Sequence, residues 1–135
     1  MTDHPGPLDH LRILVVDDDP GSLEVVAALL ELNGAQVQTA RGVSDARGLL
    51  RHFKADLVIS DLAMPAGDGF DLIMGIRKLA SDEGGKIPAI AFSASSDSLS
   101  RARALACGFQ EYLSKPVEPG LLISTVAALA RREHR

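Results

Sequence analysis

The sequence predicts an α/β domain in which helices cover both faces of a parallel sheet. Three observations favour this class. Short apolar runs are uninterrupted rather than alternating with polar residues, stretches of helical periodicity separate them, and the two patterns alternate five times. A strand that is covered on both faces carries apolar side chains in a continuous run. Because strand–helix–strand connections are right-handed, the predicted architecture is a doubly wound (βα)5 sheet.

Five strands are predicted from these apolar runs, in the order 13–16, 37–40, 57–60, 90–92 and 112–113. The run at 37–40 is the weakest candidate. The others stop abruptly at polar side chains. The first ends at Asp17, the third at Asp61 and the fourth at Ser93, while the fifth ends just before Lys115.

Five helices are predicted between and after the strands, because apolar residues recur there at helical spacing. Their apolar positions are Leu23, Val26, Ala27 and Leu30, then Ala46, Leu49, Leu50 and Phe53, then Leu72, Ile76 and Leu79, then Leu99, Ala102 and Ala106, and finally Leu122, Val126 and Leu129. Asp19 followed by Pro20 is typical of a helix start, and Gly34 of a left-handed stop. The second helix is expected after Ser44, and Gly108 is expected to end the fourth.

Length and composition indicate one soluble domain. The chain has 135 residues, of which 46% are hydrophobic, so it forms a core and is not disordered. Its 14 basic and 18 acidic residues give a formal charge of −4, which argues against a dedicated nucleic-acid-binding protein. We expect residues 1–11, which are polar and contain Pro and Gly, to be a flexible tail, and residues 12–133 to be the domain.

The same composition predicts a cytoplasmic location. The single cysteine, Cys107, has no partner for an internal disulfide, as is usual in a reducing compartment. No apolar run approaches the roughly 20 residues that span a bilayer, and the first residues lack the pattern of a signal peptide. We therefore expect neither a membrane nor a nucleic acid among the partners.

The polar residues after the strands predict a metal site. Loops at the carboxyl ends of the strands carry the functional residues of such sheets. If the first and third strands are neighbours, Asp17, Asp18 and Asp61 lie close together. Their negative charges then repel one another, and a bound cation would offset this repulsion. A hard ion with oxygen ligands, Mg²⁺, fits best. Asp19 is equally well explained as a helix cap, and Ser93 or Lys115 alone would be an ordinary surface residue. Their occurrence together favours a function.

Five segments taken together resemble the receiver domain of bacterial two-component response regulators. The resemblance runs from about residue 12 to about residue 130. The segments are Leu14 to Asp19, Leu57 to Pro65, Asp68 to Leu72, Pro88 to Ala94, and Tyr112 to Pro116. The resemblance implies a flavodoxin-like fold with strand order 2-1-3-4-5.

The resemblance also implies how the site residues divide the work of phosphoryl transfer. Asp61 matches the phosphoacceptor, and Lys115 matches the lysine that binds the phosphoryl group. Asp17 and Asp18 match the acidic pair that holds Mg²⁺, together with Asp61 and the backbone carbonyl of Ala63. No organic cofactor is expected.

Two further positions match the receiver switch. Ser93 corresponds to the switch hydroxyl, which is usually Thr in the family, and Tyr112 to the aromatic switch residue. On phosphorylation the hydroxyl is expected to turn toward the phosphoryl group, and Tyr112 to rotate into the space that this frees beneath the fourth strand. The Lys115–Pro116 peptide bond is expected to be cis, as in relatives.

The implied function is that of a phosphorylation-controlled signalling module rather than an enzyme, apart from its own phosphorylation and dephosphorylation. Its implied partners are a sensor histidine kinase or histidine phosphotransfer protein, and a downstream protein. The downstream protein would bind the face formed by the fourth helix, fifth strand and fifth helix of a monomer or weak dimer. The insertion Gly84–Gly85 leaves open a receiver from a hybrid histidine kinase that acts as a phosphorelay intermediate.

More remote alternatives belong to other classes. A haloacid-dehalogenase-like phosphatase would use Asp17 as its nucleophile, although Gly21 stands where that family has Thr or Val. A nucleotide or flavin module would need a Gly-rich or hydroxyl-rich loop after the first strand, where this chain has three aspartates. A receiver that signals without phosphorylation would be expected to lack one of the site residues.

Overall fold

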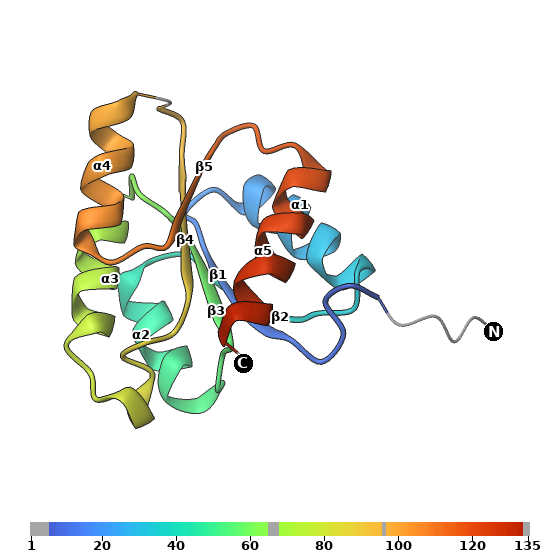
Figure 1. The fold of residues 1–135 in the computed structure, drawn as a ribbon, viewed down its shortest axis with the longest axis horizontal. Helices are drawn as coiled ribbons and strands as arrows, with labels where there is room; N and C mark the ends of the chain where they lie inside the picture. The colour runs from blue at the N-terminus through green and yellow to red at the C-terminus, as the bar shows by residue number, and fades with distance from the viewer. Residues whose placement is uncertain (1–5, 65–67, 96, 134–135) are drawn as a thin grey trace.

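The computed structural model (Figure 1) describes residues 6–64, 68–95 and 97–133, and shows a five-stranded parallel sheet between two layers of helices. The strands are β1 Arg12–Val16, β2 Gln36–Ala40, β3 Leu57–Asp61, β4 Ala89–Ser93 and β5 Glu111–Ser114. The helices are α1 Pro20–Leu32, α2 Val43–His52, α3 Gly69–Arg77, the short 3₁₀ helix η1 Ser81–Glu83, α4 Ser98–Cys107 and α5 Pro119–Glu133. The sheet order is β2-β1-β3-β4-β5, which confirms the predicted (βα)5 architecture and its flavodoxin-like order.

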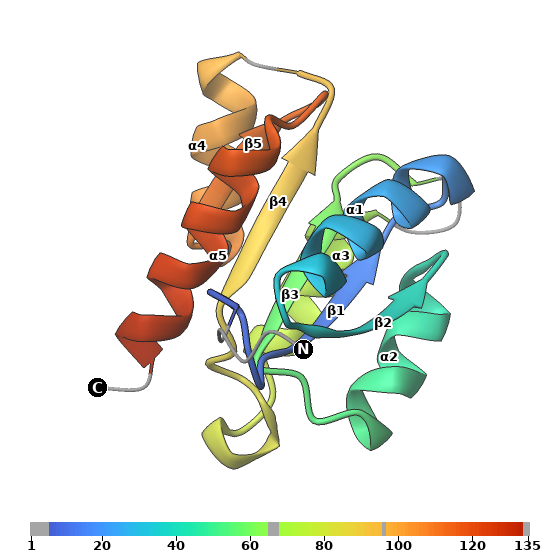
Figure 2. The same cartoon turned by 90° about the vertical axis from the view of Figure 1, so that its right-hand side faces the viewer.

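Alternate residues of the central strands enter two separate cores. In β1, Ile13 and Val15 pack with α1 and α5, whereas Leu14 and Val16 pack with α2, α3 and α4. Figures 1 and 2 show the same division, with α1 and α5 on one face of the sheet. Since both faces of the central strands are covered, 13–16 of β1, all of β3 and 89–92 of β4 are buried, and this produces the uninterrupted apolar runs of the sequence. The weakest predicted strand, β2, lies at the edge of the sheet and is largely exposed.

Local signals place most helix ends correctly. Asp19 caps α1, and its carboxylate accepts a hydrogen bond from the backbone N–H of Ser22. Gly34 and Gly108 follow α1 and α4 with positive φ angles of 105° and 126°. The expectation that the second helix follows Ser44 is wrong, because α2 already begins at Val43 after an extended Gly42. Residues 65 and 67, which belong to the predicted motif and turn before α3, lie outside the described residues.

Two predicted apolar faces need correction. Helix α3 ends at Arg77, so Leu79 is not part of it and is 40% exposed. In α4 the predicted core positions Leu99, Ala102 and Ala106 are all exposed, and Ala104 is the buried residue. The helix is short and mostly small or polar, so its few apolar residues carry little information about which face is buried.

The segment 6–11, expected to belong to a flexible tail, packs against the domain. Leu8 and Leu11 are buried in the core beneath α1 and α5. The backbone N–H of Leu8 donates to the carbonyl of Asn33, and the N–H of Gln36 donates to the carbonyl of Leu11. Burial of two leucines and these hydrogen bonds outweigh the turn-forming composition around them. Residues 1–5 lie outside the described part of the chain.

Across the part of the chain that the structure describes, we find no helix whose length and apolar character would let it cross a bilayer.

Candidate functional site

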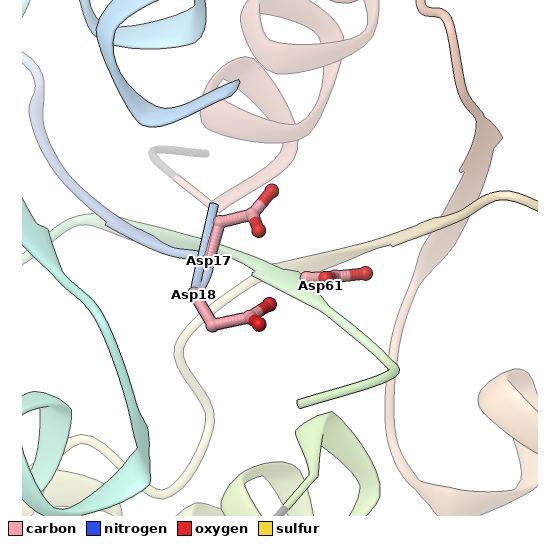
Figure 3. Close-up of side chains that lie close together, drawn as sticks. All are labelled: Asp17, Asp18 and Asp61. Atoms are coloured by element: carbon pink, nitrogen blue, oxygen red, sulfur yellow. The ribbon is translucent and has the colours of Figure 1, made fainter. Parts of the chain in front are cut away.

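The strand register brings three carboxylates to one edge of the sheet. Val16 of β1 pairs with Ser60 of β3, so the residues that follow each of them, Asp17 and Asp61, lie on neighbouring strands at the same level. One oxygen from each of Asp17, Asp18 and Asp61 lies within 4.8 Å of the others. Figure 3 shows these side chains directed into a common space. The predicted convergence of the acidic residues is therefore confirmed.

Lys115 from the end of β5 reaches this cluster. Its Nζ lies 2.8 Å from Oδ2 of Asp17 and 3.5 Å from Oδ2 of Asp61. Asp17 and Asp61 are only 3% and 8% exposed, so both ion pairs form in partly desolvated surroundings. The Lys115–Pro116 peptide bond is cis, as the resemblance implies. The lysine that follows the fifth strand is therefore a member of the cluster rather than a surface side chain.

The surroundings of Asp61 favour its neutral form. Burial and the negative charge of Asp17 raise the pKa of Asp61 above its usual value, against the opposing effects of Lys115 and of a hydrogen bond from the backbone of Ala63. Burial alone would depress the pKa of Lys115. Its hydrogen bond to Asp17 and the charges of Asp61 and Asp17 outweigh that effect, so the pKa of Lys115 is raised. One cation thus faces an excess of negative charge.

Asp19 has a different environment from the other two aspartates after β1. Its carboxylate accepts hydrogen bonds from both the hydroxyl and the backbone N–H of Ser22, and these lower its pKa. The backbone N–H of Asp19 donates a hydrogen bond to Oδ1 of Asp17, and this bond holds the Asp17 carboxylate in place. The structural explanation for Asp19, a helix cap, is the one that its contacts support.

Ser93 and Tyr112 are joined through the loop that follows β4. The hydroxyl oxygen of Ser93 accepts a hydrogen bond from the backbone N–H of Ser95, and the hydroxyl of Tyr112 donates to the carbonyl of Ser95. The guanidinium of Arg101 on α4 lies 5.4 Å from the centre of the Tyr112 ring. Tyr112 is 3% exposed, so its ring is already buried in this conformation. A rotation from an exposed position into space beneath β4 is therefore not needed to bury it.

Gly69 is a site-forming residue to which the sequence analysis assigns no role. A Cβ at this position would lie 2.4 Å from the carbonyl oxygen of Asp61 and 3.1 Å from the Cα of Leu62. The backbone N–H of Gly69 donates to the carbonyl of Leu62. The first turn of α3 therefore packs directly on the backbone that carries Asp61. Its signal in the sequence is the glycine directly after the helix-capping Asp68.

Gly69→Ala is expected to lower the free energy of unfolding by about 1–3 kcal/mol, because the new methyl group overlaps backbone atoms that cannot move aside easily. Gly48→Ala is the matched control. Gly48 lies within α2 with open space around its Cβ position, so alanine there should raise the stability by about 0.5–1 kcal/mol. Urea denaturation of both variants measures the difference. A Gly69→Ala protein as stable as the parent would contradict the close packing.

Comparisons with known proteins agree with this geometry. Residues 13–127 match the family described as the response regulator receiver domain. The chain is 43% identical over 119 residues to an uncharacterised 14.6 kDa protein of Leptolyngbya boryana, with 88% of this chain and 89% of that protein covered. It is 34% identical over 119 residues to protein PilH of Pseudomonas aeruginosa, with 87% and 96% covered.

Larger proteins and solved structures match over the same segment. The chain is 36% identical over 124 residues to the sensor histidine kinase RcsC of Salmonella typhimurium, covering 92% of this chain but 13% of RcsC. The structure of a Francisella response regulator receiver domain superposes with a TM-score of 0.84 at 28% identity, covering 92% of this chain and 99% of that one. By sequence and by fold, this chain belongs to the receiver domain family of two-component response regulators.

Proposed function

We propose that this receiver is controlled by phosphorylation of Asp61. A histidine kinase or histidine phosphotransfer protein would supply the phosphoryl group, and a downstream protein would respond to the modified form. The observation that carries the proposal is the position of the Asp61 carboxylate. It stands at a strand end beside two further carboxylates, with the Lys115 ammonium 3.5 Å away.

The proposed reaction is a direct phosphoryl transfer. An oxygen of the ionised Asp61 carboxylate attacks the phosphorus of a phosphohistidine, the P–N bond breaks as the new P–O bond forms, and the histidine nitrogen takes up a proton. Lys115 is placed to pair with the oxygens of the incoming group, since its Nζ already contacts both Asp17 and Asp61. The protein contributes position and charge, and no external substrate is turned over as in an enzyme.

The cluster fits Mg²⁺ by its donor chemistry. Asp17, Asp18 and Asp61 offer hard oxygen ligands close together, and the carbonyl of Ala63 would complete the protein ligands. When bound, Mg²⁺ supplies the positive charge that lets a phosphate dianion approach. The need for positive charge is supported by the pKa of Asp61, which burial and the charge of Asp17 raise.

The contacts of Ser93 support a path from Asp61 to the face formed by α4, β5 and α5. If the Ser93 hydroxyl turns toward a phosphoryl oxygen, it gives up the hydrogen bond from Ser95. Ser95 also holds Tyr112 through its carbonyl. The hydroxyl of Ser95 also donates to the carboxylate of Asp97, the residue that caps α4. A change at Ser93 would therefore reach both Tyr112 and the start of α4 through Ser95. In this proposal Tyr112 adjusts from a buried position instead of entering from outside.

Two uses of the same chemistry fit the relatives. The match to PilH covers 96% of that protein, and we propose for this chain a receiver that acts by direct contact with a downstream protein. RcsC contains a similar segment within a much larger sensor histidine kinase, which favours a phosphorelay intermediate. In the second case the phosphoryl group on Asp61 would pass to another histidine. We favour the first use, and propose action in the cytoplasm as a monomer or weak dimer.

The test is phosphorylation by acetyl phosphate in the presence of Mg²⁺, followed by mass spectrometry of the intact protein and of its peptides. The parent protein should gain one acid-labile phosphoryl group on Asp61. Asp61→Asn should abolish the gain. Asp19→Asn, which changes a nearby aspartate to another good helix cap, should leave it largely intact.

The position of the label separates the alternatives. A phosphoryl group on Asp17 would favour the phosphatase chemistry, and absence of any label in the parent protein would favour a receiver that signals without phosphorylation. Amide NMR of the labelled protein should show changes from Ser93 to Ser95 and along α4. Unchanged signals there would contradict the proposed path through Ser93.

A further inference from the structure

A groove between α2 and α3 is a surface that the proposed phosphorylation does not use. The two helices lie side by side on the same face of the sheet as α4 (Figure 1). Two adjoining hollows of about 670 and 880 Å³ lie along them and share Arg47, Arg51 and Gly75. None of Asp17, Asp18, Asp61 or Lys115 lines either hollow. The groove is therefore separate from the carboxylate cluster.

Four cations surround this groove: Arg47, Arg51 and Lys54 from α2 and the residues after it, and Lys78 from the end of α3. Among the residues that the structure describes, none of the four forms an ion pair or a side-chain hydrogen bond. The chain as a whole carries a charge of −4. A group of unpaired cations on an acidic protein is a local reversal of charge, and it favours an anionic partner.

The acidic residues of the groove each line one hollow and lie outside the part that the two hollows share. Asp71 belongs to one hollow, and its carboxylate accepts a hydrogen bond from the backbone of Asp68 in the cap of α3. Asp82 and Glu83 belong to the other, where Glu83 accepts from the backbone of Ala80. The shared middle carries Arg47 and Arg51, one helical turn or about 6 Å apart. The complementary occupant has its negative charges in the middle of its length.

The floor of the larger hollow is aliphatic. Leu72, Ile76 and Ile87 are buried beneath it, and Leu50 and the 40%-exposed Leu79 reach its surface. Glycine at positions 48 and 75 leaves the middle of the groove without bulky side chains, and the Arg47 guanidinium lies over Gly75. No Phe, Tyr or Trp lines either hollow, so there is no ring on which a nucleobase would stack.

From the cationic rim and the aliphatic floor we infer that the α2–α3 groove binds an acidic, amphipathic segment of a partner protein. Carboxylates of that segment pair with Arg47 and Arg51, and its leucine-like side chains cover Leu50 and Leu79. Such a contact leaves both the Asp61 site and the face formed by α4, β5 and α5 open. A partner could therefore be held on the receiver in either phosphorylation state.

The inference is tested with a labelled peptide of about 16 residues, long enough to form a helix on the groove, in which Leu-Glu-Glu-Leu is repeated in the middle and Leu-Gln-Gln-Leu forms each end. Titration into the isotope-labelled protein should shift the amides of 47–54 and 72–79, and less so at high salt. Arg47→Gln combined with Arg51→Gln should weaken binding about tenfold. Arg131→Gln, which removes an exposed cation from α5, is the matched control and should leave the affinity unchanged.

Several results would overturn the inference. These are no amide shifts at millimolar peptide, shifts confined to other faces, equal binding of the peptide with Gln in place of Glu, or an equal loss with Arg131→Gln. Displacement of the peptide by pyrophosphate or ATP in chelator would also overturn it, because the groove would then be a site for small phosphates. Asp61→Asn should bind the peptide as tightly as the parent protein does. Failure of the peptide test would therefore leave the proposed phosphorylation of Asp61 unaffected, and the reverse also holds.

Discussion

Lys115→Met is expected to lower the free energy of unfolding at neutral pH by about 1–3 kcal/mol in the presence of a chelator. The substitution keeps an unbranched side chain but removes the only cation that the described structure places against both Asp17 and Asp61. Asp17 is 3% exposed, so water cannot replace the lost partner well. The Lys115 side chain is itself 24% exposed, which keeps the loss below that of a fully buried pair.

The same substitution should slow phosphorylation by acetyl phosphate at least about 100-fold, the usual cost of removing a donor that stabilises a reacting group.

The pKa of Lys115 is raised in the folded protein, so the contribution of Lys115 to the free energy of unfolding is complete at neutral pH and declines only as the pH rises through that pKa. Urea denaturation and intact-mass kinetics measure the two effects. Lys115→Arg keeps the charge and should retain most of the stability. Its planar guanidinium would contact the phosphoryl oxygens in a different geometry from that of the lysine ammonium.

An unchanged urea midpoint for Lys115→Met would mean that the contact with Asp17 contributes nothing to folding. Unchanged phosphorylation kinetics would mean that Lys115 does not approach the phosphoryl group. The two readouts are separate, because stability depends on the pair with Asp17 at 2.8 Å and phosphorylation on the position near Asp61.

The parts of the fold that follow from short-range patterns are predictable from the sequence. The uninterrupted run at β1 and the cap at Asp19 depend on neighbouring residues only, and both are found as expected. The face of α4 is not predictable in this way. Leu99 is 82% exposed although its spacing fits a core position, because this helix is held by contacts that sequence periodicity does not report. Among them is the guanidinium of Arg103, 4.0 Å from the centre of the Phe70 ring.

The sequence predicts which residues of the candidate site lie close together, but it does not predict which of their atoms form hydrogen bonds and ion pairs. Parallel strands bring their carboxyl ends to one edge, so residues that end successive runs had to converge. The sequence does not reveal that Lys115 lies closer to Asp17 than to Asp61, or that Ser95 links Ser93 to Tyr112. These pairings depend on the register of β3, β4 and β5 and on side-chain rotamers. The packing of Leu8 likewise depends on a distant carbonyl, that of Asn33.

Asp61→Asn is expected to stabilise the protein at neutral pH while it abolishes phosphorylation. Burial and the charge of Asp17 raise the pKa of Asp61, so the folded protein holds this proton more tightly than the unfolded chain does. Stability therefore falls as the pH rises from the unfolded pKa through the folded one. Asparagine removes the ionisation and should raise the free energy of unfolding by about 0.5–2 kcal/mol, as relief of a strained functional site commonly does.

The dependence on pH distinguishes this cause from better packing. The gain of Asp61→Asn should be smallest near pH 3.8, the ordinary pKa of an aspartic acid side chain, grow as the pH rises, and level off once Asp61 is ionised in the parent protein. Asp19→Asn is the control of opposite sign, because hydrogen bonds from Ser22 lower the pKa of Asp19, which stabilises the fold above its unfolded pKa. Urea denaturation in chelator between about pH 4 and 8 measures both. A gain that is constant across this range would contradict an electrostatic origin.

Added Mg²⁺ should make the parent protein more stable than Asp61→Asn, because the parent keeps the third carboxylate for the ion and the variant does not.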